Sequence, residues 1–212
     1  SITGVGFQPD WVWIKDRDAA NWNCLMDAVR GASKVIYSNE SDAEATVSTL
    51  LTSFDSDGFS LGAAADGNRN TANFASWNWK AGGSASSNSN GSITSSVSAN
   101  QDAGFSIVSY TGTGSAATIG HGLGTTPAWV LVKERGASGE AWNNFHQSLG
   151  AGITIMLNLT NAQQSSSTMW NNTAPTSSVF SVGADAGSNG SSKTYVAYCF
   201  AEKQGYSKFG SY

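Results

Sequence analysis

Short runs of apolar residues, or of alternating apolar and polar residues, recur along the whole chain. They are rich in β-branched and aromatic residues, and Gly, Asn, Asp and Ser flank them, which is typical of β-strands. Clear examples are residues 11–15, 128–133, 153–159 and 195–200. Turn sequences such as 55–58 separate the runs, and their glycines suit the positive φ of hairpins. No long stripe of helical period interrupts them, so the pattern predicts an all-β protein.

The sequence repeats itself at a spacing of 118 to 121 residues. Residues 7–17, FQPDWVWIKDR, align with residues 125–135, TTPAWVLVKER. The alignment continues through the pairs 22–23 with 142–143, 39–43 with 158–162, 59–63 with 180–184, and the aromatic alternation of 74–79 with that of 195–200. The offset drifts slowly, so the insertions are small and fall in loops. We interpret the repeat as two tandem copies of one unit.

This repeat sets the expected domain organisation. We predict two related antiparallel β-sandwich units of jelly-roll type, a first at 1–83 that lacks its first strand and a second at 104–205. Residues 84–103 are rich in Gly, Ser and Asn, which predicts a linker, although the weak alternation of 92–98 also fits an edge strand. Residues 206–212 resemble the strand that opens the second unit. They are either the start of a third repeat or a strand that is exchanged between subunits.

The charge and hydropathy of the chain argue against nucleic acid and membrane as partners. Only 12% of the residues are charged, the net charge is −4, and the basic residues are scattered, so a nucleic-acid-binding surface is not expected. No apolar stretch approaches the length of a membrane span, so we expect no membrane insertion. Cys24 and Cys199 are too few for a disulfide framework, and we expect them to be buried thiols.

The residues that could carry catalysis are sparse. His121 and His146 lie in no catalytic or zinc-binding motif, so we predict neither an enzyme nor a cofactor. Asp55 and Asp57 could form a glycosidase pair or bind calcium, but their Asp-Ser-Asp-Gly sequence is typical of a turn. Asp27 and Arg30 are expected to form a packed structural ion pair.

Sugar recognition is the chemistry that the loops allow best. Aromatic rings stack on the apolar faces of sugars, and neighbouring amides bind the hydroxyl groups. The candidate glycan-binding residues are Trp22, Asn23, Trp142, Asn143, Asn144, Asn68 and Asn70. The alternative is that the two tryptophans are core residues, since Trp is mostly buried in folded proteins.

Several long motifs carry a resemblance to a known group of proteins. They are GFQPDWVWIKDR, DAVRGASKVIYSN, LLTSFDSDGFSLG, WNWKAGG and YVAYCFAEKQGYSKFGSY. Together with the intervening segments they resemble the repeated β domains of tail-fibre and other structural proteins of marine bacteriophages, over nearly the whole chain. The resemblance implies a concanavalin-like or jelly-roll sandwich, a place in a virion appendage, and contact with host-surface glycans.

These observations together predict a non-enzymatic structural or adhesive module of a phage virion appendage such as a tail fibre. We expect it in the virion, outside cells, as a homo-oligomer. Its expected partners are other virion or filament subunits and host-surface polysaccharide. Two alternatives are a stand-alone carbohydrate-binding module and a filament subunit that donates its C-terminal strand to a neighbour. A polysaccharide depolymerase is the least favoured reading.

Overall fold

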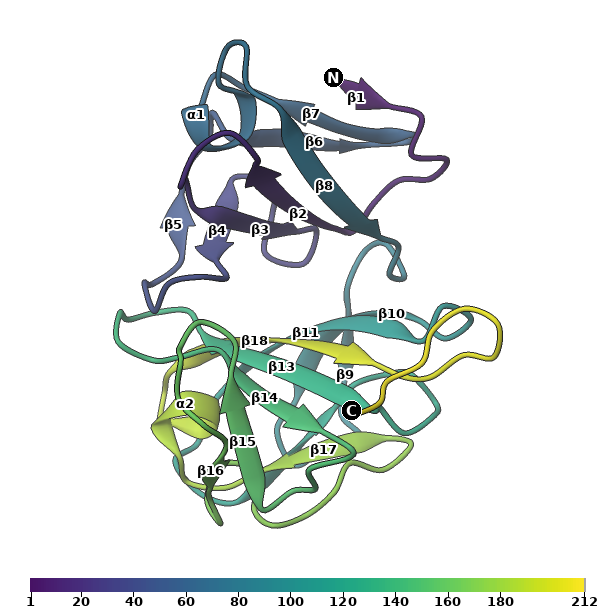
Figure 1. The fold of residues 1–212 in the computed structure, drawn as a ribbon. Helices are drawn as coiled ribbons and strands as arrows, with labels where there is room; N and C mark the ends of the chain where they lie inside the picture. The colour runs from purple at the N-terminus through teal and green to yellow at the C-terminus, as the bar shows by residue number, and fades with distance from the viewer. Residues whose placement is uncertain (212) are drawn as a thin grey trace.

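The computed structural model describes residues 1–211, which form an all-β structure of antiparallel sheets with two single-turn helices (Figure 1). The first half of the chain, residues 1–83, contains β1 (Ile2–Thr3), β2 (Trp11–Asp16), β3 (Asn23–Asp27), β4 (Lys34–Tyr37), β5 (Ala45–Thr46), β6 (Leu51–Asp55), β7 (Gly58–Leu61), α1 (Ala65–Asn68) and β8 (Phe74–Trp79). The second half, residues 84–211, contains β9 (Ser86–Asn88), β10 (Ser95–Asn100), β11 (Phe105–Thr111), β12 (Ala117–Gly120), β13 (Trp129–Glu134), β14 (Asn143–His146), β15 (Ile153–Met156), β16 (Gln164–Ser165), β17 (Val179–Val182), α2 (Ala186–Asn189) and β18 (Thr194–Phe200).

Each half has one large sheet and one small sheet. In the first half the large sheet has the order β5-β4-β3-β2-β8, and the small sheet has the order β1-β7-β6. In the second half the large sheet runs β16-β15-β14-β13-β18-β11-β10-β9, and β12 pairs with β17. A core of buried side chains fills the space between large and small sheet in each half, around Val12, Met26 and Phe59 in the first and around Val130, Phe145 and Phe180 in the second.

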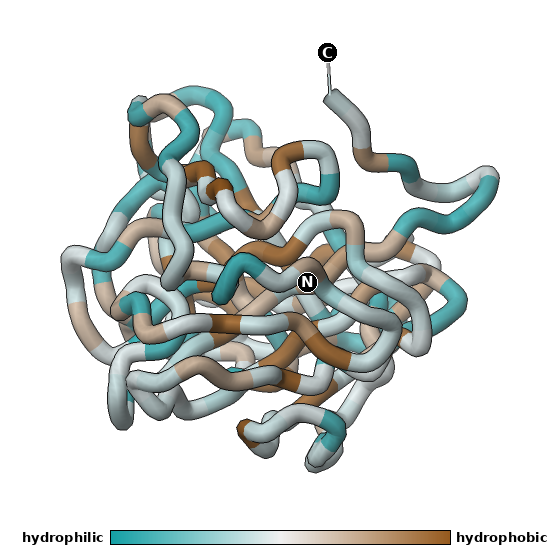
Figure 2. Tube along the Cα trace, turned by 90° about the horizontal axis from the view of Figure 1, so that it is seen from below, coloured by the Kyte–Doolittle hydropathy of each residue, from teal (hydrophilic) through white to brown (hydrophobic). Residues whose placement is uncertain are grey.

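The two large sheets pack on each other through their outer faces. Along β2, Val12 and Ile14 point into the core of the first half, whereas Trp11 points to the second half. The same alternation along β18 sends Ala197 into its own core and Tyr198 towards the first half. Both faces of these strands are therefore buried, which explains why their sequences are continuously apolar. Hydrophobic stretches accordingly run through the interior of the chain trace, and hydrophilic ones gather in its outer loops (Figure 2).

The segment with linker composition is part of the second large sheet. Residues 84–103 contain β9 and β10, and β10 pairs with β11 from Ser96 opposite Ser109 to Asn100 opposite Phe105. Val97 is buried against the core. The weak alternation of apolar and polar residues therefore indicated the structure of this segment better than its Gly, Ser and Asn content. The linker expected at 84–103 is corrected to two paired strands, of which β9 forms the edge of the sheet and β10 lies between β9 and β11.

The strand register also corrects the alignment of the two halves. Val12 lies opposite Met26 in β2 and β3, and Val130 lies opposite Phe145 in β13 and β14. Phe145 therefore takes the place of Met26, and Trp142 takes the place of Asn23. The sequence alignment, which matches Trp22 with Trp142, is shifted by one residue in this segment, and a shift of one residue moves a side chain to the opposite face of its sheet.

The C-terminal segment lies against the edge of the second half. The segment folds back on itself through a β-bridge between Lys203 and Ser207. It is held to the second half by a hydrogen bond from the Gln147 side chain to the carbonyl of Phe209, at 3.1 Å, and by the Phe209 ring, which lies 6.2 Å from that of Trp129 and 6.1 Å from that of Phe200. Tyr206 is 68% exposed. Figure 2 shows this segment at the outside of the chain trace, leading to the C-terminus.

Candidate functional site

Charged and aromatic side chains join the two halves at the contact between the large sheets. The ring of Trp11 stacks on that of Tyr198, with centroids 4.4 Å apart, and Trp142 stacks on the same tyrosine from 6.3 Å. The Trp142 indole also donates from Nε1 to the carbonyl of Tyr37, at 2.8 Å. We call this contact the seam; its apolar members are Trp11, Leu25, Ile36, Phe105, Ile107, Leu131, Trp142, Val196, Tyr198 and Phe200.

A buried ionic network forms one side of the seam. Arg30 pairs with Asp27, as the sequence predicts, and also reaches the Tyr198 hydroxyl from Nη2, at 3.2 Å. That hydroxyl donates to Asp27 Oδ2 at 2.7 Å. Burial would raise the pKa of Glu44, but hydrogen bonds and charge from Arg135 and Arg30 outweigh it and lower that pKa. Each buried charge in this network has a partner of opposite sign, which is the condition for tolerating burial.

The predicted glycan-binding residues of the second half are inside the protein. Trp142, Asn143 and Asn144 are all buried. The amide of Asn143 donates to the carbonyls of Ala141 and Gly187, and that of Asn144 donates to the carbonyl of Ile155. Because Trp142 lies within the seam, neither face of its indole is open to a sugar in this structure. For Trp142 the structure shows the core alternative, and Asn143 and Asn144 are buried beside it.

The predicted residues of the first half remain near the surface but do not form one site. Trp22 is 44% exposed and packs on Tyr37, with ring centroids 4.9 Å apart. Asn23 is half-buried and lies on the opposite sheet face from Trp22. Asn68 and Asn70 are exposed at α1 and just after it, and the Asn68 amide donates to the carbonyl of Gly62 at 2.8 Å.

Asp55 and Asp57, the two aspartates considered for calcium, accept hydrogen bonds from other groups of the protein. Asp57 accepts hydrogen bonds from the backbone N–H groups of Gly6 and Gly4, at 2.6 and 3.0 Å. Asp55 accepts from the hydroxyls of Ser53 and Ser60, both at 2.7 Å. These donors lower the pKa of both carboxyls. The described part of the chain, residues 1–211, contains no cluster of three or more His, Cys, Asp or Glu placed to hold a metal.

The histidines and cysteines have structural surroundings. His121 is buried, and its ring nitrogens contact the carbonyl of Thr176 and the N–H of Leu123. Burial lowers the pKa of His121. His146 accepts from the N–H of Ser148 through Nδ1, at 3.2 Å. Cys24 and Cys199 are buried free thiols, as expected, and burial raises the pKa of each to about 12.

An aromatic groove that the sequence does not single out lies where the seam reaches the surface. It has a volume of about 280 Å³. Trp13 lines it and is flanked by Trp77, which is 49% exposed, with ring centroids 5.8 Å apart. The remaining lining residues are polar or aliphatic: Asn23, Ser38, Asn39, Leu157, Asn158, Leu159 and Thr160. This groove combines the half-buried indole of Trp13 with several amides and hydroxyls, and the exposed indole of Trp77 lies beside it; we call it the Trp13 groove.

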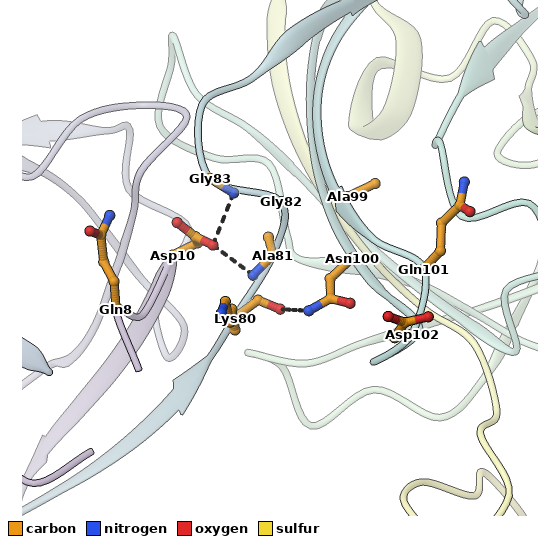
Figure 3. Close-up of a pocket in the computed structure, with 10 residues that line it drawn as sticks. All are labelled: Gln8, Asp10, Lys80, Ala81, Gly82, Gly83, Ala99, Asn100, Gln101 and Asp102. Atoms are coloured by element: carbon orange, nitrogen blue, oxygen red, sulfur yellow. Dashed lines mark hydrogen bonds between the residues drawn. The ribbon is translucent and has the colours of Figure 1, made fainter. Parts of the chain in front are cut away.

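A larger polar groove of about 640 Å³ lies beside the connection between the halves (Figure 3). Within it, buried Asp10 accepts hydrogen bonds from the backbone N–H groups of Ala81 and Gly83, at 2.8 and 3.2 Å. Across it, the Asn100 amide donates to the carbonyl of Lys80 at 3.3 Å. Burial raises the pKa of Asp10 despite the two backbone bonds. These contacts fix the connection to both halves, so it is not a free hinge.

The fold and these surfaces define an all-β protein in which two sets of antiparallel sheets are joined by a buried seam. The chain belongs to the family DUF7483, described as a domain of unknown function, whose model matches residues 1–212. No curated protein and no solved structure matches the chain. Within residues 1–211, no helix is long and apolar enough to cross a membrane.

Proposed function

We propose that this chain is a structural and adhesive module of a phage virion appendage, in which two related β-sandwich units form one rigid body. The observation that carries the proposal is the seam. A module in a fibre has to hold a fixed orientation relative to its neighbours, and relative motion of two domains is the default unless their interface is large and apolar. Here the interface is apolar, aromatic and pinned by a paired ionic network.

The relatedness of the two halves is part of the proposal. In both halves four consecutive strands and a later one occupy the same places in the large sheet, β5-β4-β3-β2-β8 and β16-β15-β14-β13-β18. A single-turn helix precedes the last of these strands in each half. Together with the repeated sequence motifs, this common order supports descent of the two units from one ancestor by duplication.

The virion location is tested directly on particles. Antibodies raised against the purified chain are applied to phage particles whose genome encodes it, and the particles are imaged by negative-stain electron microscopy. We expect label on an appendage. Particles that carry no label, although the same antibodies detect the chain in infected cells, would contradict the proposal.

Adhesion is proposed to use the Trp13 groove. Trp77 and Trp13 offer ring faces for stacking, and the amides of Asn23, Asn39 and Asn158 lie in or beside the same groove. The ligand class that fits this arrangement is a neutral or weakly charged polysaccharide of the host surface.

A glycan array with matched variants tests this assignment. Trp77→Ala removes an exposed indole beside the groove, whereas Trp22→Ala removes an indole of similar exposure on the other sheet face. We expect binding that falls at least tenfold in Trp77→Ala and is unchanged in Trp22→Ala. Binding lost only in Trp22→Ala would place the site at the loop that the sequence indicated, and would overturn the groove.

A further inference from the structure

The last strand of each large sheet has different neighbours in the two halves. In the second half, β18 lies between β13 and β11, and its pairing with β11 runs from Phe105 opposite Phe200 to Thr111 opposite Thr194. In the first half, β8 pairs with β2 on one side only and is the outermost strand of its sheet. No strand among residues 1–211 occupies the place beside β8 that β11 occupies beside β18. The backbone groups along this edge of β8 are free to pair with an added strand.

The strand β11 also fills a specific socket in the second half. Tyr110 stacks on Tyr195 at 5.1 Å between ring centroids and meets Phe180 edge-on at 6.1 Å. Its hydroxyl donates to the carbonyl of Ser188 in α2, at 2.7 Å. The wall of this socket is thus formed by β17, α2 and β18.

The corresponding residues of the first half surround an open cavity. By the alignment of the two units, Phe180, Ser188 and Tyr195 correspond to Phe59, Gly67 and Phe74. All three of the latter line a cavity of about 220 Å³, together with Ile2, Ile14, Leu61, Asn68, Ala75 and Ser76. The cavity therefore lies where β11 places side chains in the second half, and most of its lining is apolar.

Two side chains that are buried in the second half have exposed counterparts in the first. Ile119 is fully buried, whereas Ile2, which pairs with Phe59 as Ile119 pairs with Phe180, is 43% exposed. Asn189 is buried and accepts from the N–H of Thr113, whereas its counterpart Asn68 is exposed. The large sheet of the first half therefore stops at β8, whereas that of the second half continues beyond β18 with β11, β10 and β9, and the place directly beside β8 is the one that an added strand would take.

The start of the C-terminal segment resembles the start of β11, although Ser211 stands where β11 has Tyr110. Residues 205–207, Gly-Tyr-Ser, match 104–106, Gly-Phe-Ser, at the start of β11, and Phe209 matches Val108. In the register of β11, Tyr206 would lie opposite Trp79, Lys208 opposite Trp77, and Phe209 opposite Ser76 on the cavity side. Lys208 beside Trp77 would add a cation–π contact. In its present position the segment leaves Tyr206 exposed, and the contacts that the move would break are the hydrogen bond from Gln147 to the carbonyl of Phe209 and the packing of Phe209 on Trp129 and Phe200.

We propose that the open edge of β8 and the adjoining cavity bind residues 205–211 of a second copy of this chain, as an added antiparallel strand. Donor and acceptor surfaces are different, so the contact is head-to-tail and one copy can bind the next in a growing series. The inference rests on the proposed duplication, because the second half supplies the register, but it requires neither a virion nor a glycan.

A disulfide trap between two single-cysteine variants tests the contact. In the second half Ser106 and Cys199 lie opposite each other in the pairing of β11 with β18. The equivalent pair across the proposed contact is Ser207 of the donor and Asn78 of the acceptor. Mixing Asn78→Cys with Ser207→Cys under mild oxidation is expected to give a cross-linked heterodimer, since facing strands bring Cα atoms within disulfide range. The native thiols are buried and do not compete.

The matched control replaces the acceptor cysteine with Thr52→Cys, which is exposed on β6, away from the β8 edge. We expect at least fivefold more heterodimer with Asn78→Cys than with this control, and an excess of free peptide 205–211 should suppress it. A yield equal to that of the control would overturn the proposal.

Sedimentation of the unmodified chain provides a second readout. Full-length protein is expected to form larger species as its concentration rises, whereas a chain ending at Gly205 remains monomeric. Equal sedimentation of the two would overturn strand exchange. Because both experiments use the purified chain, their failure leaves the virion-labelling result unaffected, and the reverse also holds.

Discussion

Arg135 of the second half forms a two-point ion pair with Glu44 of the first. Its Nε lies 2.9 Å from Glu44 Oε2, and its Nη2 lies 3.1 Å from Oε1. The same carboxylate accepts from Arg30 Nη1 at 3.2 Å. Glu44 thus neutralises one arginine from each half, and its backbone N–H also donates to the carbonyl of Arg135. Substitution of Glu44 therefore tests whether charge pairing across the seam contributes to stability.

Glu44→Gln is expected to destabilise the protein in a pH-dependent way. The loss at pH 7 should be about 2 kcal/mol, below the range for fully buried pairs because the Glu44 side chain is 11% exposed. The pKa of Glu44 is lower in the folded protein than its ordinary value of 4.5, so its ionised form contributes stability above that pH. This contribution declines as the pH falls through the lowered folded pKa.

Urea unfolding of both proteins between pH 7 and pH 3 measures this difference. The stabilities of wild type and Glu44→Gln should differ by a constant amount above about pH 6 and converge below pH 4.5. A difference that stays constant down to pH 3 would show that the charge of Glu44 does not act across the seam.

Trp142→Ala and Trp22→Ala are expected to differ sharply in stability. Trp142 is buried in the seam and hydrogen-bonded to the carbonyl of Tyr37, so its truncation should cost about 3–5 kcal/mol. Trp22 is 44% exposed, and its truncation should cost less than about 1 kcal/mol. Urea midpoints at constant m-value give the comparison, and similar losses for both variants would contradict the placement of Trp142.

Calcium is expected to leave the thermal stability unchanged, because Asp55 and Asp57 already accept hydrogen bonds from hydroxyl and backbone donors. Asp57→Ala is expected to loosen the backbone at Gly4 and Gly6, whose N–H groups lose their acceptor. Hydrogen exchange at Gly4 and Gly6 should rise at least tenfold in the variant, while exchange in β13 stays the same. A melting temperature that rises by several degrees with millimolar calcium would reinstate these aspartates as ligands.

The sequence predicted the all-β class because alternation and turn residues are local signals. It could not show which face of each strand is buried by the other half, since that depends on how the two large sheets meet. Trp13 and Trp77 were therefore not singled out from the other strand residues. The signal that could have found them is the presence of four tryptophans, at positions 11, 13, 77 and 79, which is more than one buried contact encloses. The sequence alignment paired Trp22 with Trp142 because each is followed by Asn. The strand register shows that the two tryptophans do not occupy equivalent positions.

The linker expected at 84–103 failed for a different reason. Small polar residues are common in flexible linkers, but they are also common in strands and connecting turns that pack closely on a neighbouring segment. Gly91 illustrates this, since a Cβ there would lie 2.3 Å from the carbonyl oxygen of Thr118. Ser98 shows the same closeness, with its hydroxyl donating to the carbonyl of Gly83 at 2.7 Å. Composition alone does not distinguish these two uses.

If the seam makes the two halves one rigid body, they unfold together, and differential scanning calorimetry of the intact chain measures whether they do. We predict a single transition in which the calorimetric enthalpy equals the van't Hoff enthalpy, because neither half can unfold without exposing Trp11, Trp142 and Tyr198. Two separate transitions, of which only one responds to Trp142→Ala, would contradict the account.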